Sequence, residues 1–521
     1  MSVVGIGFLA FLAASVTLYY IVPRRWRWSV LLLSSVYFYL SYSVKAAIFL
    51  AGTALVTYGF ALWMGKLAAG CTKTPGSPEE ERARKKRRER RLKALLAAAL
   101  IINFTTLFCF KYLGFFIENV NGLLHMQLPL PSFLVPLGIS FYIFQSAGYL
   151  IDVKRGKYPP EKNFARYLLF LCYFPQIVQG PINRYGELGS QLYDGNGFHW
   201  DNIQRGVYRM MYGLMKKVLI ADALYPVVEK IYTGYESYPG VVCFFGAALY
   251  GVQLYCDFSG GIDLLCGASN LFGIRMKENF RQPYYASSLA DFWRRWHISL
   301  GEWMRDYLFY PLSMSGAFVR LSRRARKKLP PDIAKRVNPC IATFVVFLVV
   351  GVWQGPGWMN IAYGLWNGTI LSLAILWTPY GVRLNRRTGY KNHKKALLAL
   401  GMIRTNLIVT IGRYFSHASS LQNALGMLKR TFSRAFFGGV SKELFARLGI
   451  TGGSVAAVAA AWLVVALVGT ARERGVDAAA WLSGRKGYVQ FAVLFIGMAL
   501  AVYFVYGNGD YIPIAYVYEN I

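Results

Sequence analysis

Charged residues are scarce in this chain of 521 residues, at 16% of the sequence against roughly a quarter in soluble domains. A Gly-Lys-Ser/Thr phosphate loop and a Gly-x-Ser-x-Gly elbow are both missing, which argues against ATP hydrolysis and against an α/β-hydrolase. The seven cysteines mostly fall within apolar runs, and no His, Cys, Asp or Glu cluster has the spacing of zinc ligands. We therefore expect no metal site.

Long apolar runs are what the sequence has in abundance, since 55% of its residues are hydrophobic. Many runs approach the ~20 residues that a membrane helix needs. The clearest are Gly5–Val22, Ala46–Leu67, Ala94–Ile117, Phe133–Ile151, Ala342–Trp353, Val455–Gly469 and Val489–Tyr506. A membrane barrel would show alternating ten-residue segments, whereas these runs are continuous. The sequence predicts an all-α polytopic membrane protein whose first run is a retained helix and not a signal peptide.

The net charge of +33 does not indicate a nucleic-acid partner, because the basic residues form short clusters between apolar runs. Such clusters mark cytoplasmic loops, and we assign them to residues of about 70–93, 315–338 and 380–398. This assignment places both termini outside. The same charge suits anionic membrane lipid or an acidic cytosolic partner. No fixed-period repeat occurs, so residues 1–521 are predicted to form a single membrane domain.

Residues 164–279 are less regular, because Pro, Gly and polar residues interrupt the apolar runs at Phe174–Pro181 and Asp257–Gly261. Irregular backbone at membrane depth is tolerated only where protein or a cavity covers it. We expect short, tilted or re-entrant helices here, the alternative being ordinary loops outside the membrane. Further along, apolar residues at helical spacing predict an interfacial amphipathic helix around residues 421–432.

Two segments, called the dense segments below, are rich in aromatic residues together with charged residues or glycine, and they contain the candidate catalytic residues. The first, Asp291–Leu300, reads Asp-Phe-Trp-Arg-Arg-Trp-His-Ile-Ser-Leu and contains His297, which could act as a general base or a hydrogen-bond donor. An interfacial helix with Trp at headgroup level is the alternative. In the second, Gly351–Asn360, glycine and proline break a helix beside tryptophans. That break predicts either a pocket or a glycine-mediated helix contact.

Together with further stretches, these segments resemble the membrane-bound O-acyltransferase (MBOAT) family, of the bacterial alginate O-acetyltransferase and teichoic-acid D-alanyl transfer (DltB) type. The matching stretches are Val135–Tyr142, Phe174–Gln176, Gly180–Pro181, Gly213–Asp222, Tyr255–Gly260, Glu278–Phe280, Trp293–Pro311 and Gly351–Gly368. The resemblance implies a ring of roughly 11–13 transmembrane, re-entrant and interfacial helices around a tunnel, with the family core at about residues 100–375.

The function that the resemblance implies is transfer of an acyl group, acetyl or D-alanyl, to a hydroxyl of an extracytoplasmic polysaccharide or cell-wall polymer. The donor would be acyl-CoA or a phosphopantetheine-linked thioester on an acyl carrier protein, with no cofactor bound to the chain. An SGNH-hydrolase-like or DltD-like partner protein would act outside a bacterial plasma membrane. A secondary transporter would predict duplicated halves, and none is visible.

The chain departs from the family at one point, because Gln354 occupies the position of the histidine generally taken as catalytic. A second family histidine is replaced by Asn367. Glutamine cannot accept a proton from an attacking hydroxyl, although it can form hydrogen bonds. Three hypotheses stay open: His297 is the base and Gln354 orients the acyl carbonyl, the chain is a non-catalytic scaffold or acyl conduit, or Gln354 is an altered histidine.

The remaining candidate residues follow from the same resemblance. Four tryptophans are expected to wall the tunnel, namely Trp293, Trp296, Trp353 and Trp358. Asn367, Asp257 and Ser259 are expected beside the substrate path, and Asp257 and Asp306 are expected to pair with nearby Arg or Lys. The arginines Arg294, Arg295 and Arg305 suit a donor phosphate or, equally, lipid phosphate.

Overall fold

The chain folds almost entirely into helices in a computed structural model. The residues that the structure describes are 3, 5–69, 77–131, 135–388, 394–433, 436, 441–506, 514 and 516. Within those ranges the only strand-like pairing is one isolated antiparallel bridge between Phe280 and Trp296. The predicted all-α fold is confirmed.

The chain divides into two compact units. The first holds the described residues up to Met210 together with Ile262–Lys277. Its helices are α1 (Ile6–Ile21), η1 (Arg24–Trp26), α2 (Arg27–Tyr42), α3 (Val44–Ala69), α4 (Pro78–Leu107), η2 (Phe108–Tyr112), α5 (Leu113–Leu124), α6 (Ile139–Lys154), α7 (Phe164–Cys172), α8 (Phe174–Ile177), α9 (Tyr185–Tyr193) and most of α10 (Trp200–Met215). The short helices α7, α8 and α9 occur where the sequence predicts them.

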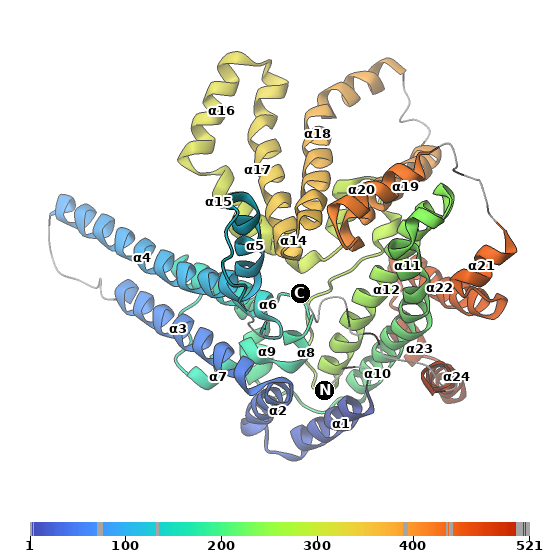
Figure 1. The fold of residues 1–521 in the computed structure, drawn as a ribbon. Helices are drawn as coiled ribbons and strands as arrows, with labels where there is room; N and C mark the ends of the chain where they lie inside the picture. The colour runs from blue at the N-terminus through green and yellow to red at the C-terminus, as the bar shows by residue number, and fades with distance from the viewer. Residues whose placement is uncertain are drawn as a thin grey trace. The chain divides into compact units, whose positions relative to one another are not determined.

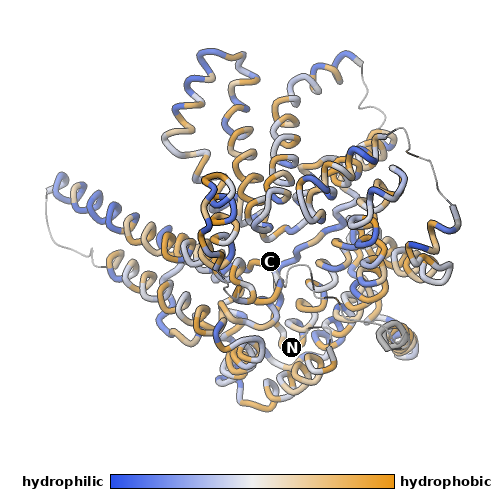
Figure 2. The backbone as a smooth tube through the Cα atoms, viewed as in Figure 1, coloured by the Kyte–Doolittle hydropathy of each residue, from blue (hydrophilic) through white to orange (hydrophobic). Residues whose placement is uncertain are grey.

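Helix α4 shows how the sequence sets a helix start and a change of environment. Ser77 accepts a hydrogen bond from the backbone of Glu80 while the Glu80 side chain accepts one from the backbone of Ser77, and Pro78 occupies the first turn. Three glutamates follow at the positive end of the helix dipole. The first half of α4 is hydrophilic and the second half is hydrophobic, as Figure 2 shows. Part of the predicted basic segment 70–93 is therefore helical.

The second unit comprises Met211–Gly261 and the described residues from Glu278 onward. Its helices are η3 (Lys216–Asp222), α11 (Ala223–Thr233), η4 (Tyr235–Ser237), α12 (Gly240–Leu271, whose last turns belong to the first unit), η5 (Pro283–Tyr285), α13 (Leu289–Arg295), α14 (Ile298–Met304), η6 (Arg305–Phe309), α15 (Tyr310–Ser313), α16 (Gly316–Lys328), α17 (Pro331–Gln354), α18 (Trp358–Thr388), α19 (Lys394–His417), α20 (Leu421–Thr431), α21 (Lys442–Leu448), α22 (Gly452–Glu473), α23 (Ala478–Ser483) and α24 (Gly487–Tyr506).

Helices α17 and α18 lie side by side and are joined by a short Gly-Pro-Gly turn (Figure 1). A Cβ atom added to Gly351 would lie 2.5 Å from the Asn360 carbonyl oxygen and 2.8 Å from the Cα of Gly364. The two backbones therefore lie very close together, as they do in membrane helix pairs that have glycine at their interface. This contact brings the end of α17 against the start of α18.

Seven helices are long and apolar enough to cross a membrane, among the residues that the structure describes. They are Val44–Ala69, Pro78–Leu124, Gly240–Leu271, Pro331–Gln354, Trp358–Leu384, Lys395–His417 and Gly452–Glu473. The chain is thus a multi-pass membrane protein. The first and last apolar runs form the shorter helices α1 and α24, and the predicted amphipathic segment forms α20.

One local expectation is wrong. The predicted interruption at Asp257–Gly261 does not occur, because α12 runs through it without a break. The glycine serves packing instead: a Cβ atom on Gly260 would lie 2.8 Å from the carbonyl oxygen of Gly213. Small residues such as glycine let membrane helices approach each other closely without ending the helix.

Candidate functional site

His297 lies between two short helices in the second unit, α13 and α14. Ser288 begins α13 by accepting a hydrogen bond from the backbone of Asp291. The helix ends at Arg295, and His297 then adopts a left-handed conformation with φ of 47°. Few residues other than glycine occupy this region, although histidine is enriched among them. This turn directs the chain into α14.

Backbone pairing fixes the turn around His297. The Arg281 amide donates to the Arg295 carbonyl at 2.9 Å, and the Ile298 amide donates to the Asn279 carbonyl at 3.0 Å. With the bridge between Phe280 and Trp296, these bonds tie residues 279–281 to residues 295–298. The histidine is therefore held in place by the extended segment that precedes α13.

The imidazole of His297 is buried, with 1% of the residue exposed. Its Nδ1 lies 3.2 Å from Oδ1 of Asn279. The rings of Phe258 and Trp353 contact it edge-on, at centroid distances of 4.9 Å and 5.7 Å. Burial lowers the pKa of His297 to about 3, so the imidazole is neutral near pH 7. A neutral imidazole has one nitrogen that can accept a proton.

Trp353 connects the second dense segment to His297. It lies one residue before Gln354, the last residue of α17, and its side chain is buried. The ring contact with His297 therefore brings the end of α17, and with it the backbone of Gln354, to the histidine. Trp358 differs from the other tryptophans predicted to wall a tunnel, because it is 55% exposed at the start of α18.

Asn367 is joined to the first dense segment through Trp293. The indole Nε1 of Trp293 donates to Asn367 Oδ1 at 3.1 Å, and Asn367 Nδ2 donates to the Tyr363 carbonyl at 2.9 Å. Helices α13, α17 and α18 and the turn between α13 and α14 thus bring together the predicted residues Trp293, His297, Trp353 and Asn367. The role of each in a reaction stays a prediction.

A buried arginine, Arg413, lies over the ring of Trp296. The Arg413 guanidinium lies 4.7 Å from the centre of the Trp296 ring, and both residues are buried. Cation–π contacts of this kind are stronger when they are desolvated. Sequence reasoning missed Arg413, although an arginine inside an apolar run is itself a signal of a functional or structural site.

Asp257 and Ser259 face two buried lysines of η3. Lys217 Nζ lies 2.6 Å from Asp257 Oδ1 and 2.9 Å from Asp222 Oδ1, while Lys216 Nζ donates to Ser259 Oγ at 2.9 Å. Burial opposes the charge of Lys217, but the two carboxylates outweigh it and raise its pKa. The expected pairing of Asp257 with a lysine is confirmed, and its partner belongs to a stretch that resembles the family.

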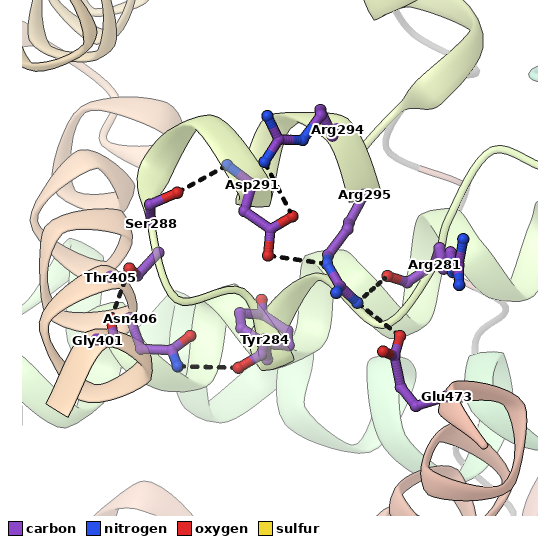
Figure 3. A network of polar contacts seen from close by, with 10 residues as sticks. All are labelled: Arg281, Tyr284, Ser288, Asp291, Arg294, Arg295, Gly401, Thr405, Asn406 and Glu473. Atoms are coloured by element: carbon purple, nitrogen blue, oxygen red, sulfur yellow. Dashed lines mark hydrogen bonds and ion pairs between the residues drawn. The ribbon is translucent and has the colours of Figure 1, made fainter. Parts of the chain in front are cut away.

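A network of ion pairs surrounds Arg295 (Figure 3). Its guanidinium contacts Asp291 at 3.1 Å and Glu473 at 2.5 Å, and it also donates to the Arg281 carbonyl. The Arg294 side chain contacts Asp291 at 3.4 Å but is 71% exposed. Arg305 pairs with Asp306 at 2.9 Å, as expected, and is 51% exposed. Of the three predicted phosphate ligands, Arg295 is the one whose donors are already engaged by two carboxylates.

Comparison with known proteins decides the family. A profile of the membrane-bound O-acyltransferase family matches residues 139–323. The chain is 32% identical to the probable alginate O-acetylase AlgI of Pseudomonas aeruginosa over 465 residues, which cover 88% of this chain and 79% of that protein. The chain belongs to the membrane-bound O-acyltransferase family.

Two further relatives extend the range of acyl groups within this family. The peptidoglycan O-acetyltransferase of Helicobacter pylori is 28% identical over 436 residues, covering 78% of this chain and 73% of that protein. The teichoic acid D-alanyltransferase of Bacillus subtilis is 28% identical over 240 residues, covering 45% of this chain and 58% of that protein. The chain is accordingly an O-acyltransferase, as the sequence predicts.

The family match covers the lysine and aspartate cluster, Asn279 and His297, whereas Gln354 and Asn367 lie beyond residue 323. Within the described residues, no group of three or more His, Cys, Asp or Glu side chains could hold a metal ion.

Proposed function

We propose that this chain transfers an acyl group from a cytosolic thioester to a hydroxyl group of an extracytoplasmic polysaccharide or cell-wall polymer. The observation that carries the proposal is the neutral, buried His297, held beside the end of α17 in a chain of this family. The relatives described above act on alginate, peptidoglycan and teichoic acid by name. Their shared feature is a polymer with hydroxyl groups outside the cytoplasm.

In the proposed reaction, the acceptor oxygen attacks the carbonyl carbon of the thioester. A carbon–oxygen bond forms, the carbon–sulfur bond breaks, and the acyl group leaves its thiol. His297 Nε2 takes the proton of the hydroxyl group and returns it to the departing thiolate, so that the histidine ends neutral. Proton transfer by a placed side chain contributes about 10²–10⁴-fold to rate, which sets the size of effect to look for.

Gln354 is proposed to hydrogen-bond the acyl carbonyl. It ends α17, one residue beyond the tryptophan that contacts His297, and its amide can donate to an oxygen without changing charge. The second candidate function is a catalytically impaired relative that scaffolds an assembly or conducts the acyl group. This candidate is supported by Gln354 itself, because the amide cannot replace a histidine as base.

The donor and its partners are proposed from charge and exposure. The donor is acyl-CoA or an acyl carrier protein, and the exposed Arg294 and Arg305 are the candidate ligands of its phosphate. Arg295 is proposed to be structural, since it is engaged by two carboxylates. We place the chain in a bacterial plasma membrane with both termini outside, where the polymer or a partner protein receives the acyl group through the proposed tunnel.

Acetyl is the acyl group to test first. The relatives that align with 78–88% of this chain are named as O-acetylases or O-acetyltransferases, whereas the D-alanyltransferase of Bacillus subtilis aligns with 45%. A D-alanyl donor would require a different cytosolic partner, so a labelled donor of each type separates the two.

The test measures ester-linked acyl groups on cell-surface polymers of a deletion strain. The strain is complemented with the unaltered chain, with His297→Ala, with Gln354→His, or with His199→Ala, an exposed histidine outside the site. The proposal expects esters with the unaltered chain and with His199→Ala, and none with His297→Ala. Esters formed only by Gln354→His would establish the impaired relative instead, and full activity of His297→Ala would remove His297 from the reaction.

A further inference from the structure

The side chain of Asn279 lies within hydrogen-bond distance of the His297 ring. It is fully buried, and its Oδ1 lies within hydrogen-bond distance of three groups: His297 Nδ1 at 3.2 Å, the Ser299 amide at 3.0 Å and Ser299 Oγ at 2.9 Å. Asn279 lies 18 residues before the histidine, within the stretch Glu278–Phe280 that resembles the family.

The Ser299 amide settles which end of the Asn279 side chain faces the histidine. Oxygen and nitrogen of an asparagine are nearly indistinguishable by shape alone. A backbone N–H can only donate, so the atom 3.0 Å from it must be the oxygen. An NH₂ group at that place would set two donors against each other.

The same oxygen then determines the tautomer of His297. An amide oxygen only accepts hydrogen bonds, so the Nδ1 that faces it must carry a proton. In a neutral imidazole the lone pair is then on Nε2. The bridge between Phe280 and Trp296 and the backbone bonds on both sides of it hold Asn279 in register with His297.

We infer that Asn279 is a positioning residue that holds His297 as the Nδ1–H tautomer, with Nε2 as the proton-accepting atom. The tautomer itself does not depend on the proposed function, whereas the role of Nε2 in accepting the proton of the acceptor hydroxyl rests on it. Partners that fix one ring nitrogen in this way are what set the orientation and tautomer of an imidazole. Asn279 does not touch the reacting atoms in this account; it acts through the histidine.

Solid-state ¹⁵N NMR of histidine-labelled protein in lipid tests the tautomer directly, without any measurement of activity. The signal of His297 is taken from the difference between the wild type and His297→Gln. We expect one neutral tautomer with the proton on Nδ1. In Asn279→Ala we expect a mixture of the two tautomers, and in Asn279→Asp a return to Nδ1–H, because a carboxylate oxygen also accepts. A proton on Nε2 in the wild type would overturn the inference.

Acyl transfer supplies the second readout. Asn279→Ala should lower kcat about 10²-fold with little change in KM, in line with the contribution of a placed base, and Asn279→Asp should recover at least part of the loss. Asn103→Ala is the matched control, since Asn103 is also a buried asparagine with a side-chain hydrogen bond, to Thr57. It should retain its activity per folded molecule.

The two proposals fail in different ways. Full activity of His297→Ala, together with a wild-type Nδ1–H tautomer, would defeat the proposed base while leaving the role of Asn279 in the tautomer intact. An unchanged tautomer and activity in Asn279→Ala would defeat the positioning role while leaving His297 as the base. Asn279→Asp that is folded and matches the alanine variant in both readouts would also count against the positioning role.

Discussion

Lys217 offers the sharpest test of the packing that surrounds the site. Only 1% of its side chain is exposed, and its ammonium contacts the carboxylates of Asp257 and Asp222 at 2.6 Å and 2.9 Å. The ring of Tyr516 lies 4.5 Å from the same ammonium. The substitution Lys217→Met keeps the approximate length of the side chain and removes the charge that both carboxylates face.

The expected loss of stability follows from a property of buried ion pairs: removing one partner costs more than the intact pair contributes. Removing one partner of such a pair destabilises a fold by about 3–5 kcal/mol, because the opposite charge stays buried. Asp257→Asn removes one negative charge, retains an acceptor atom and leaves the contact between Lys217 and Asp222. Its expected cost is about 1–3 kcal/mol. The double substitution should cost less than the sum of the two, by about 0.5–3 kcal/mol, because the residues are in contact.

Thermal unfolding in detergent, followed with a thiol-reactive dye, measures these differences. Buried free cysteines become reactive when the fold opens, and the structure places four in this class: Cys172, Cys243, Cys256 and Cys266. Lys45→Met is the control, since Lys45 is exposed and a surface change is expected within about 0.5 kcal/mol of the wild type. An unfolding midpoint of Lys217→Met equal to that of Lys45→Met would refute the reasoning.

Three further predictions follow from single contacts. Gly351→Ala should destabilise the fold by about 1–3 kcal/mol through overpacking, whereas Gly52→Ala, with no atom within 4 Å of the added Cβ, should not; unfolding midpoints decide. Gln354→Ala should lower kcat about tenfold, the value of about one hydrogen bond, and equal rates would remove Gln354 from the site. Burial lowers the pKa of His297 to about 3, from an ordinary value of 6.5, so at pH 5 the unfolded state binds a proton that the folded state does not. The free energy of unfolding should therefore be fully present above pH 6.5 and lower by about 2 kcal/mol at pH 5. His297→Asn should not show this loss.

Much of the fold follows from hydrophobic runs, which depend only on local sequence. The predicted helices around residues 46–67 and 489–506 occur as α3 and α24. The predicted break at residues 257–261 was wrong because one glycine can serve either to end a helix or to let two backbones touch. Which of these occurs depends on a partner segment, here at Gly213, that lies far away in sequence.

The candidate site could be predicted in part. The density of aromatic and charged residues along the sequence is enough to single out His297 and its neighbours. Asn279 and Arg413 lie outside the two dense segments, and their significance comes from contacts across 18 residues of chain in one case and from a different helix in the other. Lys217 carries little signal of its own, since a lysine beside an apolar run usually marks a loop.

Acyl transfer by purified protein in liposomes tests the central claim most directly. A labelled thioester is supplied on one side of the membrane and a hydroxyl acceptor on the other, and the labelled ester is counted for the wild type and for His297→Ala. Our account predicts ester formation by the wild type, with Gln354 in place, and a rate at least about 10²-fold lower for His297→Ala. Equal rates in the two proteins would contradict it.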